Sequence, residues 1–314
     1  MNRRRRPWVV VLAGGEGTRV RTLTRDRSGQ PAPKQYAAIV DGDRTLMATT
    51  LARARRITSP DRIMPVVAEH HERWWRNELA GEPLRNAVIQ PADRGTAAGI
   101  LVPVLKILSQ DPAAIVVTMP SDHAVDSEDL LVDSVARAVD EIDWFHLPIV
   151  VLGVEPVRPE EGYGWILPCS GPRTCPLRVA AFREKPGVCA ASALVDQGAM
   201  VNTMIVAAEG RCLLALFKTE APELWRRCER QWSAQSPRFR RRTDIVGLYR
   251  SIPRLDFSKD VLEPAEKDLW VYRVPPCGWT DLGTPARIGD HRDLHRPPRG
   301  APARSTVFGV DGSP

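Results

Sequence analysis

The stretch WVVVLAGGEGTR, residues 8–19, decides the fold class that this chain predicts. Its first half, Trp8–Ala13, is a continuous apolar and β-branched run, which is typical of a parallel strand covered on both faces. Its second half places three glycines, a threonine and an arginine where that strand must end. Glycines allow positive φ angles and let backbone N–H groups approach an anion, and Arg19 adds a forked cation. The stretch therefore predicts a strand that leads into a phosphate-binding loop.

The spacing of the glycines, at positions 14, 15 and 17, excludes two common nucleotide-binding motifs. A Walker P-loop would close with GK[ST], and a dinucleotide-binding loop would follow the pattern GxGxxG. The remaining alternative is a tight turn between a strand and a helix that binds no ligand.

An alternation of strand and helix patterns continues through the first half of the chain. Apolar runs predict further buried strands at 63–68, 87–90, 114–119 and 148–154. Helices are expected at 45–56, 70–79, 96–108 and 127–142, the last capped by Ser127, and another near 213–232. This rhythm predicts an α/β fold with a doubly wound sheet.

Basic charge is concentrated in two segments. The formal net charge is +6, yet four arginines stand at 3–6 and the stretch 225–254 carries about +7, which leaves the remaining chain near −5. We interpret 3–6 as a solvated terminus and the arginine-rich run 238–242 as a solvated face. Phosphate or nucleic-acid binding by that run is the alternative, and we expect no nucleic-acid partner.

The composition excludes disordered, collagen-like and disulfide-stapled proteins, because 43% of the 314 residues are hydrophobic and 26% are charged. The six cysteines show no CxxC pair and no zinc spacing, so free thiols are expected. No apolar run reaches 18 residues, which predicts a cytoplasmic protein without a membrane partner. We expect a basic terminus at 1–7, one large domain at 8–294 and a loose tail at 295–314.

Two charged residues stand where ligands bind in an open α/β sheet. Lys34, in the tetrapeptide PKQY, is close enough in sequence to the glycine loop to reach the same anion, and only six of the 44 basic residues are lysines. Asp122 follows a predicted strand, at the edge where a catalytic carboxylate is expected. A hard oxygen ligand beside phosphates suits Mg²⁺, whereas the alternative is a helix-capping Asp. We expect His123 to orient a neighbour rather than to bind the metal.

Seven short motifs follow one another along residues 8–290, and three of them would be ordinary turns or surface pairs if taken alone. They are LAGGEGTR at 12–19, PKQ at 33–35, QPADRGTA at 90–97, PSDH at 120–123, EGYG at 161–164, REKP at 183–186 and GWTDLG at 278–283. As an ordered set they resemble the sugar-1-phosphate nucleotidyltransferases, and within that family the mannose-1-phosphate guanylyltransferases (GDP-mannose pyrophosphorylases).

The resemblance implies a Rossmann-like catalytic domain on a doubly wound mixed, mostly parallel sheet. It implies a nucleotidyltransferase that joins a nucleoside triphosphate, with GTP favoured, to a sugar 1-phosphate, with mannose 1-phosphate favoured. A nucleotide sugar and pyrophosphate would form by Mg-assisted in-line attack on the α-phosphate. Because the attacking phosphate oxygen is already ionised, no general base is needed, and catalysis reduces to positioning and charge neutralisation.

The resemblance also assigns site residues by matching position. The nucleotide would be bound by Leu12, Ala13, Gly14, Gly15, Gly17, Thr18, Gln90, Pro91 and Thr96. The sugar would face Gly164, Glu184 and Asn202. The catalytic cations would be Arg19, Lys34 and Lys185, and the Mg²⁺ ligands would be Asp122 and Asp281.

The chain departs from the family pattern at several points. The link between Thr24 and Pro33 is long, and Arg21-Thr22 replaces a usual Trp-Pro. The stretch 201–204 lacks the usual Trp and Gly around its asparagine, which leaves the sugar open. The match near 256–263 is loose, so no site residue is carried from it. No cupin or β-helix extension is visible, so no isomerase activity or regulation from such a domain is expected.

Several alternatives remain open at this point. A nucleotidyltransferase of other base or sugar specificity is one, although the cytidylyltransferases that share PKQY lack REKP and GWTDLG. A non-catalytic regulatory subunit that binds nucleotide sugars is another. The presence of all the proposed catalytic cations and metal carboxylates argues against it; they are Arg19, Lys34, Lys185, Asp122 and Asp281. A homodimer is compatible with the sequence.

Overall fold

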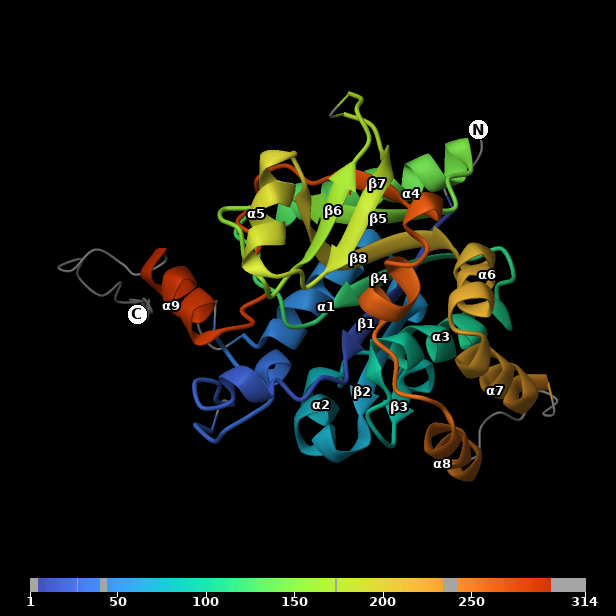
Figure 1. Cartoon of the computed structure of the whole chain (residues 1–314). Coiled ribbons are helices and arrows are strands. Elements are labelled where there is room, and N and C mark those ends of the chain that lie inside the picture. The colour runs from blue at the N-terminus through green and yellow to red at the C-terminus, as the bar shows by residue number, and fades with distance from the viewer. Residues whose placement is uncertain (1–4, 27, 40–43, 173, 234–241, 295–314) are drawn as a thin grey trace, which may run out of the picture.

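The computed structural model describes residues 5–26, 28–39, 44–172, 174–233 and 242–294. The expected tail at 295–314, most of the run 238–242 and two of the arginines at 3–6 lie outside the described residues. Figure 1 shows the chain with a sheet at its centre and helices on both sides of it.

Nine strands of the described chain form one sheet in the order β3-β2-β1-β4-β8-β5-β9-β7-β6. Their bounds are β1 Trp8–Ala13, β2 Ile63–Ala68, β3 Val88–Gln90, β4 Ile115–Pro120, β5 Ile149–Val154, β6 Gly164–Pro168, β7 Leu177–Glu184, β8 Met200–Glu209 and β9 Trp270–Arg273. Strands β3, β2, β1 and β4 run parallel, and β8 runs antiparallel to β4 and β5. The predicted α/β fold on a mixed sheet is confirmed.

Helices cover both faces of the sheet, which explains the continuous apolar strands. The helices that the structure describes are α1 Leu46–Ile57, α2 Glu72–Glu78, α3 Gly95–Leu108, α4 Glu128–Phe145, α5 Val188–Asp196, α6 Gly210–Glu220, α7 Pro222–Ser233, α8 Arg242–Ser251 and α9 Pro285–Leu294. Val10 packs in a core with α3, α6 and α7, whereas Val9 and Val11 pack with α1 and α4. Successive side chains of β1 thus point into two hydrophobic cores, one on each face of the sheet, as expected for a doubly wound sheet.

Three sequence expectations about helices need correction. The single helix expected near 213–232 is two helices, because Pro222 has no backbone N–H to continue α6 and instead starts α7. The helix expected at 70–79 begins as a 3₁₀ turn, Glu69–His71, before α2. Ser127 does occupy the cap position of α4, but its side chain makes no capping hydrogen bond.

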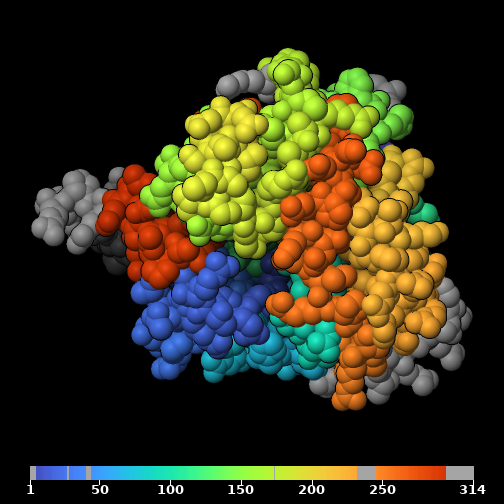
Figure 2. Space-filling model, in the orientation of Figure 1, coloured from blue at the N-terminus to red at the C-terminus, as the bar shows by residue number. Residues whose placement is uncertain are grey.

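The carboxyl ends of β1, β2 and β4 meet at one edge of the sheet, where ligands bind in open α/β folds. Figure 2 shows a hollow on one face, bordered by the blue N-terminal segment, the yellow-green β6–β7 region and the orange segment before β9. None of the helices that the structure describes combines the length and the apolar character needed to cross a membrane.

Candidate active site

The glycine loop after β1 has a shape that side chains would prevent. Gly17 has a φ of +60°, and a Cβ atom there would lie 2.9 Å from the backbone nitrogen of Lys34. At Gly14 a Cβ atom would lie 2.4 Å from Oε1 of Gln90. Gln35 holds the loop in place, because its Nε2 donates to the carbonyls of Ala13 and Gly15 at 3.0 and 2.8 Å.

Two exposed residues, Thr18 and Arg19, follow this loop. No described residue forms an ion pair with Arg19, so its guanidinium is available to an anion that approaches the loop.

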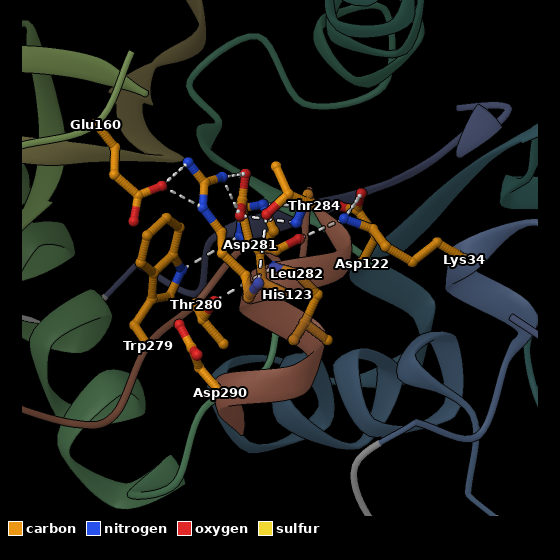
Figure 3. Close-up of polar contacts among 12 residues, drawn as sticks. Lys34, Asp122, His123, Glu160, Trp279, Thr280, Asp281, Leu282, Thr284 and Asp290 are labelled. Atoms are coloured by element: carbon orange, nitrogen blue, oxygen red, sulfur yellow. Dashed lines mark hydrogen bonds and ion pairs between the residues drawn. The ribbon is translucent and has the colours of Figure 1, made fainter. Parts of the chain in front are cut away.

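Lys34 lies beneath the loop and joins two distant segments. Its side chain is 6% exposed, and Nζ lies 2.8 Å from Oδ2 of Asp122, directly after β4. The same Nζ donates to the backbone carbonyl of Asp281. Ser121 fixes the end of β4 against β1, because its N and Oγ both donate to the carbonyl of Leu12. Lys34, Asp122 and Asp281 therefore come together from three parts of the chain, as Figure 3 shows.

Asp281 is held by a buried arginine that the sequence did not single out. Nη1 of Arg287, in α9, lies 2.7 and 2.9 Å from the two carboxylate oxygens of Asp281. The Arg287 side chain is 5% exposed, its Nε donates to Glu160 at 2.6 Å, and its guanidinium stacks on the ring of Tyr163 at 3.7 Å. One clue was available, since Glu160 directly precedes the EGYG motif.

The residues expected to face the sugar form a second group on β6, β7 and β8. Gly164 pairs with Glu184 across the β6–β7 hairpin, and a Cβ atom at Gly164 would meet Oε2 of Glu184 at 2.5 Å and Asn202 at 3.2 Å. Nζ of Lys185 donates to Oε1 of Glu184 at 2.5 Å. The amide of Asn202 donates to Ser258 at 3.3 Å and accepts from its own strand. The structure thus brings all four predicted residues together.

The expected base-recognition residues lie against the segment 249–257. Nε2 of Gln90 donates to the hydroxyl of Tyr249 at 3.0 Å, and Oγ1 of Thr96 accepts from the backbone N–H of Phe257 at 2.8 Å. Pro91 lies between them in sequence and is half-buried. These hydrogen bonds fix the position of the segment, and they leave other atoms of Gln90 and Thr96 for a ligand.

The sequence profile of the nucleotidyl transferase family matches residues 8–293. The chain belongs to this family. Among its relatives, the mannose-1-phosphate guanylyltransferase ManC of Salmonella typhimurium is 29% identical over 296 residues, which are 88% of this chain and 58% of the relative. The mannose-1-phosphate guanylyltransferase of Escherichia coli is 27% identical over 292 residues, again 88% and 58%. The chain therefore spans 58% of the length of these curated relatives.

Solved structures support the same fold. A mannose-1-phosphate geranyltransferase from Thermus thermophilus is 25% identical with a TM-score of 0.76, and the match covers 88% of this chain and 76% of that one. A UDP-glucose pyrophosphorylase complexed with UDP-glucose has a TM-score of 0.56 at 13% identity, covering 92% of this chain and 98% of that one. The second likeness concerns the fold alone.

The electrostatics of the nucleotidyl transferase keep Asp122 ionised. Burial alone would raise the pKa of Asp122, but the nearby ammonium of Lys34 outweighs it, and the pKa lies below its ordinary value. Burial lowers the pKa of His123 to about 4, so this ring is neutral at pH 7. Its Nδ1 accepts from Nε1 of Trp279 at 3.2 Å. His123 is thereby fixed against the segment that carries Asp281.

The donor atoms near Lys34 fit a magnesium ion in part. Two carboxylates on neighbouring segments offer the hard oxygen ligands that Mg²⁺ prefers. The Asp122 side chain is 37% exposed; its Oδ2 pairs with Lys34, and its Oδ1 lies 3.6 Å from Nε2 of His123. Asp281, by contrast, has both oxygens engaged by Arg287. Each carboxylate oxygen has two lone pairs, so both Asp122 and Asp281 could offer a ligand atom, although the charge of Arg287 makes Asp281 the weaker ligand.

A segment from which no site residue was predicted lies beside the sugar group. The backbone N–H of Glu184 donates to Oε2 of Glu263 at 3.2 Å, and a π-helical turn, Ser258–Leu262, precedes Glu263. Burial raises the pKa of Glu184, Lys185 opposes that shift, and the acidic groups of Asp256 and Glu263 add to it. The loose sequence match at 256–263 hid this role, because the contact spans 79 residues.

Proposed function

We propose that this nucleotidyl transferase joins GTP to mannose 1-phosphate and releases pyrophosphate. The observation that carries the proposal is the meeting of Lys34, Asp122 and Asp281 next to a glycine loop with an exposed Arg19. Such a constellation suits a polyanionic substrate whose reaction needs charge neutralisation and no base. The names of the relatives support GTP and mannose 1-phosphate as the substrates.

The triphosphate would lie against the loop that Gly14, Gly15 and Gly17 shape, with Arg19 at its exposed side. Lys34 would contribute its charge from beneath, shared with Asp122. An oxygen of the sugar phosphate attacks the α-phosphorus, a new P–O bond forms, and the bond between the α-phosphorus and the bridging oxygen breaks. Its electron pair leaves with pyrophosphate. No proton has to be removed from the nucleophile at neutral pH.

The sugar would occupy the group on β6, β7 and β8. Gly164 lets the side chains of Glu184 and Asn202 come close to the strand, and their carboxylate and amide offer hydrogen bonds to hydroxyl groups. The half-exposed ammonium of Lys185, 48% exposed, can leave Glu184 for the sugar phosphate. The base would be recognised next to Gln90, Pro91 and Thr96.

We propose Mg²⁺ as the cofactor, held by Asp122 and Asp281. When bound, the ion would supply positive charge next to the phosphates and neutralise charge that develops during transfer. Lys34 holds Asp122 in place for it, and Arg287 holds the carboxylate of Asp281.

Two broader expectations belong to the proposal. The six cysteines, all within the described residues, are free thiols, which supports action in the reducing cytoplasm. The family resemblance leaves a homodimer as an expectation, which light scattering of the purified chain tests.

A matrix of five nucleoside triphosphates against mannose, glucose and fucose 1-phosphates tests the function, with pyrophosphate release as the readout. We expect the highest kcat/KM for GTP with mannose 1-phosphate. A higher value for another pair would refute these substrates, and no release with any pair would favour the regulatory-subunit alternative.

A further inference from the structure

Three metal-ligating side chains meet beside the glycine loop, on the side of β2. Glu16 stands within the loop, between Gly15 and Gly17, and His70 and His71 end the 3₁₀ turn that follows β2. Nε2 of His70 lies 2.5 Å from Oε1 of Glu16, and Nε2 of His71 lies 3.6 Å from Oε2. One donor atom from each residue lies within 4.8 Å of the others. No residue of this cluster belongs to the site proposed for nucleotidyl transfer.

His71 supplies a second, independent observation. Its side chain is 1% exposed, yet neither ring nitrogen has a hydrogen-bond partner among the residues that the structure describes. The separation of 3.6 Å from Glu16 is too long for such a bond. Buried polar nitrogens are rarely left unsatisfied, because desolvation without a partner is unfavourable. A buried ring with unmatched nitrogens, one directed at a carboxylate, indicates a missing ligand.

The surroundings hold the His71 ring in place. It packs edge-on against Tyr36 and Trp74, with centroids 5.8 and 5.5 Å away. Arg21 lies 3.6 Å from Oε2 of Glu16, but its side chain is 41% exposed and can turn to solvent.

The chemistry of the three donors selects among cations. Two imidazoles and one carboxylate are a common three-ligand set for Zn²⁺, with a fourth position left to water. Mg²⁺ and Ca²⁺ prefer oxygen ligands throughout. Donor atoms bound to one tetrahedral Zn²⁺ ion lie about 3.4 Å apart. His71 and Glu16 are already near this separation, whereas His70 would have to turn away from Glu16, which its exposed ring permits.

We propose that Glu16, His70 and His71 form a zinc-binding site that ties the glycine loop to the turn after β2. The ion replaces the direct contact between Glu16 and His70 and satisfies a nitrogen of His71. Because Glu16 lies between two loop glycines, binding restricts the loop whatever the reaction of the protein, so the inference does not rest on the proposed function.

The test uses the whole chain after removal of metals with EDTA. It is titrated with Co²⁺ and Zn²⁺ in excess Mg²⁺, with calorimetry and the visible spectrum as readouts. We expect one Zn²⁺ per chain and a Co²⁺ spectrum without a thiolate band. His70→Gln and Glu16→Gln should each weaken Zn²⁺ binding at least tenfold. The matched controls, His146→Asn and Glu223→Gln, remove an exposed histidine and an exposed acid elsewhere in the chain and should bind like the wild type.

A second readout reports on the loop itself. Hydrogen exchange at residues 14–18 should slow when Zn²⁺ is added to the wild type and should stay unchanged in His70→Gln, whose substituted side chain is exposed and does not threaten folding. The site does not exist if the wild type binds no Zn²⁺ or if His70→Gln binds Zn²⁺ as tightly as the wild type. A thiolate band in the Co²⁺ spectrum would also overturn it, because the cysteines would then hold the ion.

Discussion

Lys34 neutralises charge at one point of the molecule and holds two segments together at that point. A compact ammonium group suits this position, because it reaches the carboxylate of Asp122 and the carbonyl of Asp281 with one nitrogen. The sequence could predict Lys34 and Asp122 as site residues from their places after a loop and a strand. It could not predict that the backbone of Asp281 completes the group, since nothing in a motif records a contact over 247 residues.

Substitution of Asp122 separates catalysis from stability. Asp122→Asn should lower kcat at least 100-fold, because the carboxylate proposed for Mg²⁺ is lost, while the amide still accepts from Lys34. The free energy of unfolding should fall by about 1 kcal/mol. Steady-state kinetics and urea unfolding check both values. Asp129→Asn, with a side chain 86% exposed, is the control and should match the wild type. Unchanged turnover in Asp122→Asn would refute the metal assignment.

Substitution of Glu184 should stabilise the fold and at the same time weaken function. The pKa of Glu184 is higher in the folded state than in the unfolded state. Between these two pKa values the folded state binds more protons than the unfolded state, so the contribution of Glu184 to stability falls as the pH rises. Glu184→Gln removes this buried charge and should stabilise the fold by about 1 kcal/mol at pH 8. The gain should shrink as pH falls toward 5, and KM for the sugar phosphate should rise. Urea unfolding at several pH values measures it, and a gain that grew as pH fell would contradict this sign.

The strands were easier to predict from the sequence than the ends of the helices. β1 and β2 begin and end where their apolar runs do, because a strand buried on both faces is apolar at every position. The boundary between α6 and α7 was missed, although Pro222 marks it, because the amphipathic pattern continues across the break. The start of α3 depends on a contact that no local pattern encodes.

A close contact between Gly95 and Leu255 predicts that an alanine at position 95 would destabilise the fold. Gly95, the first residue of α3, has a φ of +77°, and a Cβ atom there would lie 2.0 Å from the carbonyl oxygen of Leu255. Gly95→Ala should destabilise the fold by about 2 kcal/mol and raise KM for the nucleotide, because Thr96 would shift with the helix start. Gly99→Ala, in the same helix, meets only ordinary contacts from 3.5 Å and is the control. Equal unfolding midpoints for the two variants would disprove the argument.

Contacts between residues far apart in the sequence hold the C-terminal helix α9 against the rest of the protein. Arg287 of α9 joins Asp281 to Glu160, which lies 127 residues away, and stacks on Tyr163 next to the sugar group. The order of the motifs along the chain predicted which family this is. The motifs could not predict that Arg287, which lies outside all of them, connects Asp281 to Tyr163. This connection depends on how α9 packs against the rest of the protein.

Removal of this arginine should weaken the fold as a whole. Arg287→Met leaves the carboxylates of Glu160 and Asp281 without their partner, so the free energy of unfolding should fall by about 3 kcal/mol. Thermal unfolding and urea titration measure the loss. Arg292→Met changes an exposed arginine of the same helix and should leave stability unchanged. If Arg287→Met lowered the free energy of unfolding no more than Arg292→Met, the contacts of Arg287 would not be needed for stability.

The proposed reaction transfers a nucleotidyl group from GTP to the phosphate of mannose 1-phosphate. Its path can be followed by mass spectrometry of the products formed from mannose 1-phosphate that carries ¹⁸O in its three non-bridging phosphate oxygens. Attack by one of these oxygens on the α-phosphorus predicts GDP-mannose that retains all three labels and pyrophosphate that contains none. Label in the pyrophosphate, or no GDP-mannose at all, would contradict the account.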